Sequence, residues 1–295
     1  MSKKIAPQQN ESSWEVGNTS LDLSPEAFAR FASFITAELG MKMPESKLAL
    51  VQSRLVRRIR DLRMKSADEY ADYFFASSHA GEREHFINAI TTNKTDFFRE
   101  PDHFNFLCDV ILPDLGSAAA RRGERFKVWS AGCSSGEEAY TTGMLLADYA
   151  IRQPGFDFAI LGTDISTKVL ASARSAIYHE AQLVDVPPEF RRKYLLRSRN
   201  KADHVSRIIP ELRRKISFHQ LNFMDDDYLI KDIFDVVFFR NVMIYFDRPI
   251  QEAVINKICR NLAPGGYLFS SHSESVAGLD IPVKSIKAAV YRKVA

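Results

Sequence analysis

The alternation of strand-like and helix-like segments in the second half of the chain restricts the fold more than any other feature of the sequence. Residues 126–131 and 234–239 are rich in apolar side chains and have the length of buried strands. Residues 137–150 and 249–262 have the spacing of amphipathic helices, and Pro264-Gly265-Gly266 ends the second of them. Strands and helices that alternate at this spacing predict an α/β fold, with a parallel sheet covered by helices on both faces.

Further segments extend this scheme, with one interruption. Residues 158–162 and 267–271 are predicted strands, and Ser166 is expected to begin another helix. Residues 290–294 are expected to close the edge of the sheet. Residues 189–219 carry many charges and only short β-type pieces, which predicts a small inserted β subdomain.

The first third of the chain has helical periodicity without strand-like runs. Ser24-Pro25-Glu26 combines an N-cap hydroxyl, a proline at the first helical position and an acid near the positive end of the helix dipole. Gly40 ends the apolar stripe that follows. Further helices are predicted at residues 46–64 and after the capping box of Ser66 and Glu69.

These patterns define the expected domains. Residues 1–20 are polar and lack periodicity, so they are predicted to be a disordered tail. A polar stretch follows Gly116, and residues 21–115 are therefore predicted to form a helical domain. Residues 116–295 are predicted to form the α/β domain.

Composition excludes several classes of protein. The 40 Lys and Arg residues nearly balance the 37 Asp and Glu residues, so the whole molecule would not attract nucleic acid. Three cysteines, far apart and without metal-ligand spacing, favour reduced thiols and no metal site. No apolar run reaches the length of a membrane span, and the first residues have no signal core. We expect a cytoplasmic protein that does not insert into the membrane.

Polar residues follow the first predicted strand of the sheet, at the edge where parallel sheets bind their ligands. Residues 130–136 form a turn with two glycines, and Glu137 and Glu138 begin the next helix. An acid at this position suits a ligand with an ammonium group. The segment could equally be an ordinary connection whose acids favour the helix dipole.

Later strands end in polar residues too. Asp164 could accept hydrogen bonds from both hydroxyls of a ribose or cap the next helix, and Asn222 could bind an adenine edge or shape a turn. Arg240-Asn241 ends a strongly apolar run, so the guanidinium must be paired or face the cleft. An acid-rich cleft favours S-adenosylmethionine, whose sulfonium and ammonium groups are both positive, over the phosphate-bearing NAD.

Several motifs together resemble the chemotaxis receptor glutamate methyltransferases of the CheR type. They are TTNKTDFFRE at residues 91–100, the turn and paired acids at 130–138, RNVMIYF at 240–246 and HSES at 272–275. The resemblance covers about residues 21–294. It implies an all-α N-terminal domain packed on a Rossmann-like class I methyltransferase domain, with S-adenosylmethionine bound between them and S-adenosylhomocysteine as the product.

The same resemblance implies roles for individual residues. Glu138 is the expected partner of the methionine ammonium, although Glu137 stays open, and Ala139 stands where the family often has proline. Arg99 and Tyr245 are the candidates for holding the substrate carboxylate, Arg99 through its forked donors and Tyr245 through a neutral hydroxyl. The expected cofactor-binding residues are Asn93, Thr95, Arg99, Glu138, Asp164, Asn222, Phe223, Arg240 and Asn241.

A basic helix supplies the expected partner surface. Opposite the apolar stripe of residues 46–64 stand Arg54, Arg57, Arg58 and Arg63, with few opposing acids. Such a surface would attract the acidic helical bundle of a receptor's cytoplasmic signalling region. Some relatives also bind a tethering pentapeptide through a glycine-containing loop of the β insertion. The matching residues 197–204 lack glycine, which favours a tether-independent enzyme.

Two other functions fit the same fold. A nucleic-acid methyltransferase could use the arginines for phosphates, but the balanced charge disfavours it, as does the lack of an Asn/Asp-Pro-Pro-Tyr/Phe motif. A non-catalytic adaptor that binds S-adenosylmethionine would keep the fold without turnover, and the presence of Arg99, Asp164 and Asn241 argues against it. We expect a monomer.

Overall fold

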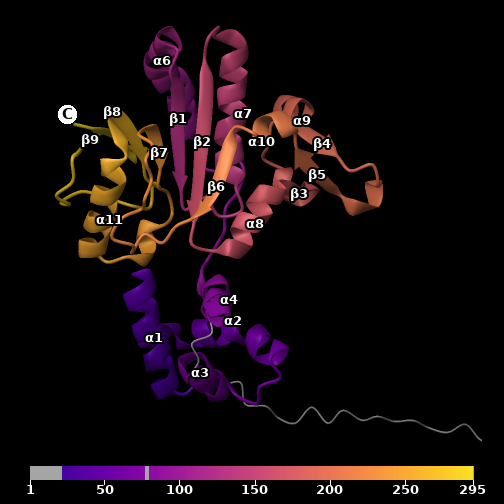
Figure 1. Ribbon diagram of the computed structural model, residues 1–295, viewed down its shortest axis with the longest axis vertical. Helices are drawn as coiled ribbons and strands as arrows, with labels where there is room; N and C mark the ends of the chain where they lie inside the picture. Colours follow the sequence, from indigo (N-terminus) through magenta and orange to yellow (C-terminus); the bar gives the residue numbers. More distant parts are fainter. Residues whose placement is uncertain (1–21, 77–79, 295) are drawn as a thin grey trace, which may run out of the picture.

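The chain folds into two units of different architecture. The computed structural model describes residues 22–76 and 80–294, so the predicted tail at residues 1–20 lies outside the described residues. Figure 1 shows a smaller all-α unit, made of α1–α4, below a larger α/β unit. Within the described ranges, no helix is both long and apolar enough to cross a membrane.

The all-α unit confirms the helices predicted at the N-terminal end. The Oγ of Ser24 accepts a hydrogen bond from the Ala27 amide, and Gly40 ends the first helix with a left-handed φ of 66°. The Oγ of Ser66 likewise accepts from the Glu69 amide at 3.0 Å. The helices are α1 Pro25–Leu39, α2 Leu48–Asp61 after the short turn η1 Glu45–Lys47, α3 Ala67–Ala76 and α4 Ala80–Ile90.

This unit has an aromatic core of its own. Phe31 is fully buried, and its ring stacks on Phe86 with centroids 5.0 Å apart. Ile35, Leu55 and Tyr70 complete the same cluster. Because side chains three and four positions apart share one face of a helix, the apolar stripes of α1–α4 all point into this cluster.

The segment that follows belongs to the other core. The helices α5 Pro101–Phe106, η2 Leu107–Gly116 and α6 Ser117–Arg122 follow one another directly, so residue 115 lies inside a helical stretch. Leu107 and Ile111 are fully buried against the sheet residues Val128 and Phe238. We therefore propose a domain boundary near residue 92 in place of residue 115. The polar stretch after Gly116 is a partly exposed helix and not a linker.

The main sheet has seven strands in the order β6-β2-β1-β7-β8-β10-β9. The first five are mutually parallel, and β10 pairs antiparallel with both β8 and β9. On this side of the sheet the edge strand is therefore β9, with β6 at the other edge, and the expectation that residues 290–294 close the edge was wrong. The bounds are β1 Arg125–Ala131, β2 Asp157–Asp164, β6 Ile216–Gln220, β7 Phe234–Phe238, β8 Leu262–Phe269, β9 Val283–Lys287 and β10 Val290–Lys293.

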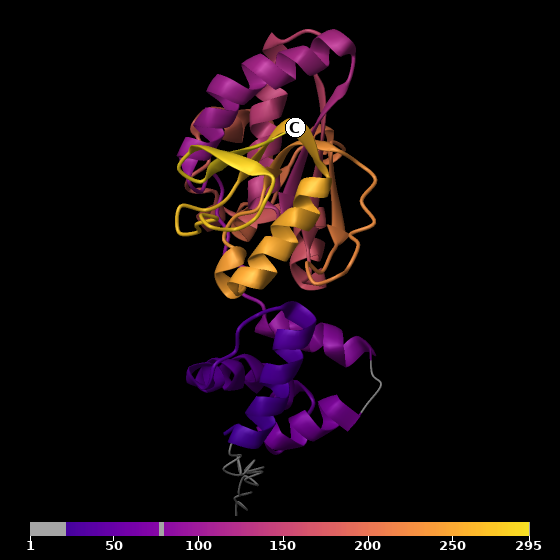
Figure 2. The same ribbon diagram turned by 90° about the vertical axis from the view of Figure 1, so that its left-hand side faces the viewer.

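Helices cover both faces of this sheet, as predicted. Alternate side chains of a strand point to opposite faces. Val128 of β1 accordingly packs in the core that holds Tyr140 of α7, whereas Trp129 packs in the core that holds Ile255 of α11. Figure 2 shows the two layers on either side of the strands. The covering helices are α7 Glu137–Arg152, α8 Thr167–Ser175 and α11 Arg248–Arg260.

The inserted β subdomain is present with different limits. It is a three-stranded antiparallel sheet in the order β3-β5-β4 and begins at residue 177, not at residue 189. Residues 216–219, assigned to the insertion from the sequence, belong to β6 of the main sheet, where they pair with β2. Its elements are β3 Ile177–His179, η3 Glu180–Leu183, α9 Pro188–Tyr194, β4 Leu195–Arg197, η4 Lys201–Asp203, β5 Val205–Ile208 and α10 Pro210–Arg213.

Candidate functional site

A pocket lies between the two units, at the carboxyl ends of the parallel strands. Figure 1 shows these strand ends directed toward the all-α unit. Leu39 and Met41 line the pocket from the all-α side. The pocket is also lined by every residue predicted to bind the cofactor or the substrate: Asn93, Thr95, Arg99, Glu138, Asp164, Asn222, Phe223, Arg240, Asn241 and Tyr245.

Glycine allows the turn after β1 to lie against neighbouring loops. Gly132 has a φ of 83°, and a Cβ at this position would lie 2.5 Å from Cγ2 of Val242. Gly136 has a φ of 96°, and a Cβ there would lie 3.0 Å from Cβ of Ala173. An L side chain at either position would strain the backbone and clash with its neighbours. Gly132 thus lets the pocket lining approach Val242, and Gly136 lets the turn pack against the helix that contains Ala173.

Asp164 ends β2 with its carboxylate held at the pocket wall. Its Oδ2 accepts a hydrogen bond from the Ser134 amide at 2.9 Å, and its Oδ1 accepts from the Ser166 amide at 3.0 Å. Only 8% of the residue is exposed, and this burial raises the pKa of the carboxyl above its ordinary value. Each oxygen can still accept one further hydrogen bond, which is the arrangement that a pair of ribose hydroxyls needs.

The paired acids at the start of α7 point in different directions. Glu138 lines the pocket, and its Oε1 accepts a hydrogen bond from the Ser130 hydroxyl at 2.6 Å. Glu137 is buried away from the pocket, where Ser135 and Gln182 donate to its carboxylate. Of the two acids that the sequence left open, Glu138 is the one that lines the pocket, and its contact with the methionine ammonium stays a prediction. Burial raises the pKa of both carboxyls.

Arg240 is both paired and directed at the pocket. Its Nε lies 3.5 Å from Glu138 and 3.4 Å from Glu100, and its Nη2 donates to the Arg99 carbonyl at 2.5 Å. The guanidinium carbon lies 5.5 Å from the centre of the Phe104 ring. Nη1 is buried and has no hydrogen-bond partner among the described residues. A buried donor of this kind is costly unless a ligand accepts its hydrogen bond.

Comparison with known proteins identifies the family. Residues 26–91 match the CheR methyltransferase all-alpha domain, and residues 93–292 match the CheR methyltransferase SAM binding domain. The chain belongs to the CheR methyltransferase family. The division between the two matches agrees with a boundary near residue 92.

Named relatives cover nearly the whole chain. The chemotaxis protein methyltransferase of Escherichia coli is 36% identical over 260 residues, which are 88% of each protein. Chemotaxis protein methyltransferase 2 of Pseudomonas aeruginosa is 34% identical over 93% of this chain and 95% of its own. The chemotaxis protein methyltransferase of Borreliella burgdorferi is 34% identical over 94% of this chain and 97% of its own. The predicted family is confirmed.

S-adenosylmethionine is the cofactor of this methyltransferase, and the pocket has the chemistry to hold it. Two carboxylates, the partly buried Glu138 and the buried Asp164, face the space in which a cationic ligand would lie. The unpartnered Nη1 of Arg240 offers a donor to an amino acid carboxylate. Phe223 and Val242 add apolar walls. The cationic, anionic and apolar parts of the cofactor thus each have a complementary group.

The all-α unit holds the pocket loops through its backbone. The side-chain amide of Asn222 donates to the Glu38 carbonyl at 2.8 Å, and the backbone amide of Lys42 donates to the Tyr245 carbonyl at 3.0 Å. Asn88 accepts from the Ser166 hydroxyl at 2.7 Å, beside Asp164. Three loops that carry candidate cofactor or substrate residues are therefore anchored on one side of the cleft.

The predicted partner-binding arginines do not share one environment. Arg54 donates to the Thr91 carbonyl and the Thr92 hydroxyl, and so holds the segment that joins the two units. Arg58 forms an ion pair with the buried Glu82, which also accepts from Tyr70. Arg57 and Arg63 are exposed. Helical periodicity identified the polar face of α2, but it could not reveal that Arg54 and Arg58 are used internally.

Sequence reasoning gave no role to two acids beside the pocket. Glu274 is 7% exposed and accepts hydrogen bonds from the amides of Asn241 and Ser271, both at 2.9 Å. Glu100 contacts Arg240. Both residues lie in motifs that carried the family resemblance. Their place in these motifs was the signal in the sequence that could have identified them. Glu274 fixes the loop after β7.

Proposed function

We propose that this enzyme transfers the methyl group of S-adenosylmethionine to glutamate side chains on the cytoplasmic signalling region of methyl-accepting chemotaxis receptors, giving glutamate methyl esters. The observation that carries the proposal is one pocket, lined by Glu138, Asp164 and Arg240, in a member of the CheR methyltransferase family. The names of the relatives place their activity in chemotaxis. Action on receptors implies a cytoplasmic enzyme.

The cofactor is assigned along the pocket by chemical complementarity. Asp164 accepts the ribose hydroxyls, and Asn222 with Phe223 contacts the adenine. Glu138 accepts from the methionine ammonium, while Arg240 and Asn241 contact the methionine end. Asn93, Thr95 and Arg99 close the pocket from the segment between the two units.

The acceptor needs orientation and not deprotonation. The cofactor supplies a methyl group activated by its sulfonium. A glutamate carboxylate has a reference pKa of about 4.3, so it is already ionised at neutral pH and no general base is required. Arg99 and Tyr245 both line the pocket and offer donors that align this carboxylate. Arg99 donates to the Lys94 carbonyl with Nη1 alone, and its other nitrogens can bind a substrate.

The exposed basic end of α2 is the surface to which we assign receptor docking. The side chain of Arg57 is 89% exposed, and its contact with Asp61 is a loose one at 4.0 Å. Arg63 is exposed just beyond the helix. These charges attract an acidic receptor bundle and orient it during association. We keep Arg57 and Arg63 in the docking proposal and give Arg54 and Arg58 internal roles.

Labelled S-adenosylmethionine incubated with the enzyme and receptor membranes tests this function. We expect label on receptor peptides that contain glutamate, and its release as methanol in mild alkali, because methyl esters hydrolyse under these conditions. Label that resists alkali, or that appears on nucleic acid, would contradict the proposal. A mapped peptide would also identify the modified residues.

A further inference from the structure

Several buried polar atoms without hydrogen-bond partners gather behind the pocket. Among the described residues, Glu100 Oε2, both ring nitrogens of His103, and Nε and Nη1 of Arg240 share this state. They lie where α5 begins, beside the strand end that carries Arg240. Buried polar atoms that lack a hydrogen bond are costly even where opposite charges lie nearby, so their concentration at one place indicates a function.

Glu100 is the residue that connects these groups. Its Oε2 lies 3.3 Å from Nδ1 of His103 and 3.4 Å from Nε of Arg240. Its Oε1 accepts a hydrogen bond from the Ser271 hydroxyl at 2.6 Å, and that hydroxyl accepts from Nδ2 of Asn241 at 2.7 Å. One carboxylate thus reaches both polar residues at the end of β7.

The backbone around Glu100 has an unfavourable conformation. Glu100 has a left-handed φ of 57°, and Phe98, two residues earlier, has a φ of 55°. Residues other than glycine seldom adopt this region, and such strain is concentrated at functional sites. The strained turn directs Glu100 toward the interior, where its side chain is 16% exposed.

The charges explain why a second acid is needed. The guanidinium of Arg240 lies between two carboxylates, with Nε 3.4 Å from Glu100 and 3.5 Å from Glu138. If Glu138 were its only acidic partner, the pair would be mutually neutralised, and Glu138 would attract a ligand ammonium less strongly. A second carboxylate at the same nitrogen competes with Glu138 and keeps Arg240 from pairing with it alone.

We propose that Glu100 is a positioning residue that holds Arg240 away from Glu138 and anchors Asn241 through Ser271, and so sets the affinity for the charged amino acid end of the cofactor. This inference rests on the proposed placement of the methionine end at Glu138 and Arg240. Glu100 itself does not touch the cofactor. It acts through the two residues that do.

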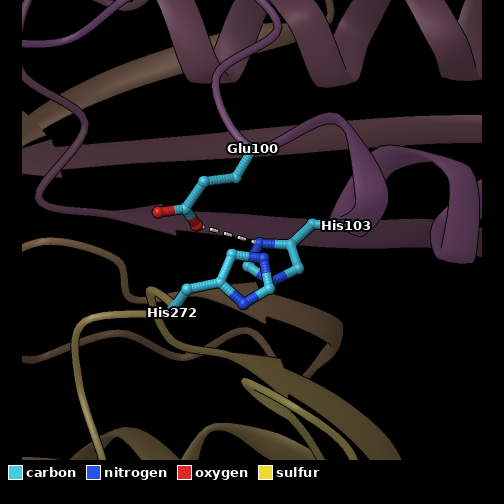
Figure 3. Close-up of side chains that lie close together, drawn as sticks. All are labelled: Glu100, His103 and His272. Atoms are coloured by element: carbon cyan, nitrogen blue, oxygen red, sulfur yellow. Dashed lines mark ion pairs between the residues drawn. The ribbon is translucent and has the colours of Figure 1, made fainter.

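A metal site is the competing interpretation of the same residues. Figure 3 shows Glu100, His103 and His272 directed toward one another, and their ligand atoms lie within 4.8 Å. However, the Glu100 oxygen that faces His103 is also 3.4 Å from the Arg240 guanidinium. A divalent cation there would lie close to a fixed positive charge, which disfavours its binding.

Two ligands that differ at one end test the positioning role. S-adenosylhomocysteine carries the amino acid end, whereas 5′-methylthioadenosine lacks it. We expect Glu100→Gln to weaken S-adenosylhomocysteine binding about tenfold, equivalent to about 1.4 kcal/mol, and to leave methylthioadenosine binding unchanged. Titration calorimetry measures both. Asp102→Asn is the matched control, since Asp102 is an exposed acid two residues later, in the first turn of α5, and it should change neither affinity.

The outcomes separate this inference from the function on which it rests. Equal weakening of both ligands by Glu100→Gln would indicate a general disturbance of the pocket and overturn the proposal. If Glu100→Gln weakened the binding of neither ligand while Glu138→Gln still weakened that of S-adenosylhomocysteine, the role of Glu100 would be refuted and the cofactor placement would stand. Failure of the wild type to bind S-adenosylhomocysteine would refute the placement. A loss of affinity in the wild type on treatment with EDTA would also overturn the inference, because a cation would then hold Glu100.

Discussion

The two units contribute to the cleft in different ways. The α/β unit supplies charged side chains that line the pocket, namely Glu138, Asp164 and Arg240. The all-α unit reaches the pocket loops mainly through backbone groups, such as the Glu38 carbonyl and the Lys42 amide. We propose a division of labour from this comparison, in which one unit recognises the cofactor and the other fixes the loops and meets the receptor.

The largest expected effect concerns an ion pair inside the all-α unit. Arg58→Ala leaves the carboxylate of Glu82, which is 3% exposed, without its cationic partner. We expect a loss of about 3 kcal/mol in the free energy of unfolding, measured by denaturant or thermal melting. Arg57→Ala is the matched control, because its side chain is exposed, and it should stay within about 0.5 kcal/mol of the wild type.

The pH dependence of this loss has a defined sign. Burial alone would raise the pKa of Glu82, but hydrogen bonds from Arg58 and Tyr70 bring it below its ordinary value. A carboxyl with a lowered pKa stabilises the fold above its unfolded pKa, about 4.3, and this contribution is lost as the pH falls through the folded pKa. The stability difference between Arg58→Ala and the wild type should therefore shrink below about pH 4. A difference that is constant down to pH 2 would contradict this account of Arg58.

The next effect tests recognition by the α/β unit. Asp164→Asn removes the negative charge and leaves a single acceptor oxygen for two backbone amides and the ribose hydroxyls. Hydrogen bonds to charged groups contribute about 1.5–3 kcal/mol, so we expect S-adenosylhomocysteine to bind roughly 10- to 100-fold more weakly. The substitution also leaves the amide of Ser134 or of Ser166 without its acceptor, so we expect the melting temperature to fall by a few degrees, and the affinity is measured well below it. Unchanged affinity would remove Asp164 from the site.

A smaller effect tests positioning by the all-α unit. Asn88→Ala removes the acceptor for the Ser166 hydroxyl and the donor to Thr167, both next to the loop of Asp164. We expect about a fivefold weaker cofactor affinity, equivalent to about 1 kcal/mol. Asn256→Ala is the control, since Asn256 makes a comparable hydrogen bond to the Asp280 carbonyl away from the pocket. Equal effects of the two variants would remove the positioning role of the all-α unit.

The smallest effect concerns the receptor surface. Arg57→Glu combined with Arg63→Glu should raise the Michaelis constant for receptor several-fold, more at low salt than at high salt, because these charges are exposed. The affinity for the cofactor should stay the same. Steady-state kinetics at two salt concentrations separate the two constants. Parallel loss of receptor and cofactor binding would mean that the substitutions disturb the fold.

Local signals predicted most of the fold. Caps such as Ser24 and Gly40 act within a few residues, and the strand-helix alternation gave the parallel sheet and placed Asp164 and Arg240 at strand ends. Non-local pairing accounts for the errors. β6 pairs with β2, whose partner residues lie 56 positions earlier, and most of β6 was assigned to the insertion, because sequence pattern alone does not reveal a pairing partner.

The candidate site was predicted less completely than the fold. Family motifs named the residues that line the pocket, but the ion pair of Arg58 with Glu82 and the contacts of Glu100 depend on residues far apart in the chain.

The connection between β4 and β5 is the glycine-free segment from which independence of a receptor pentapeptide was predicted. Hydrogen bonds from Ser198 and Asn200 to Asp203 hold it. That independence stays a prediction, and a calorimetric titration with the peptide would test it.

The central claim is that the cleft between the two units binds a methyl donor that carries two positive charges. A crystal structure with S-adenosylhomocysteine, the product left by that donor, tests it most directly. We expect the ribose hydroxyls on Asp164 and the ammonium on Glu138, with the adenine beside Phe223. Clear density for the ligand outside this cleft, or within it but with neither carboxylate in contact, would contradict the account.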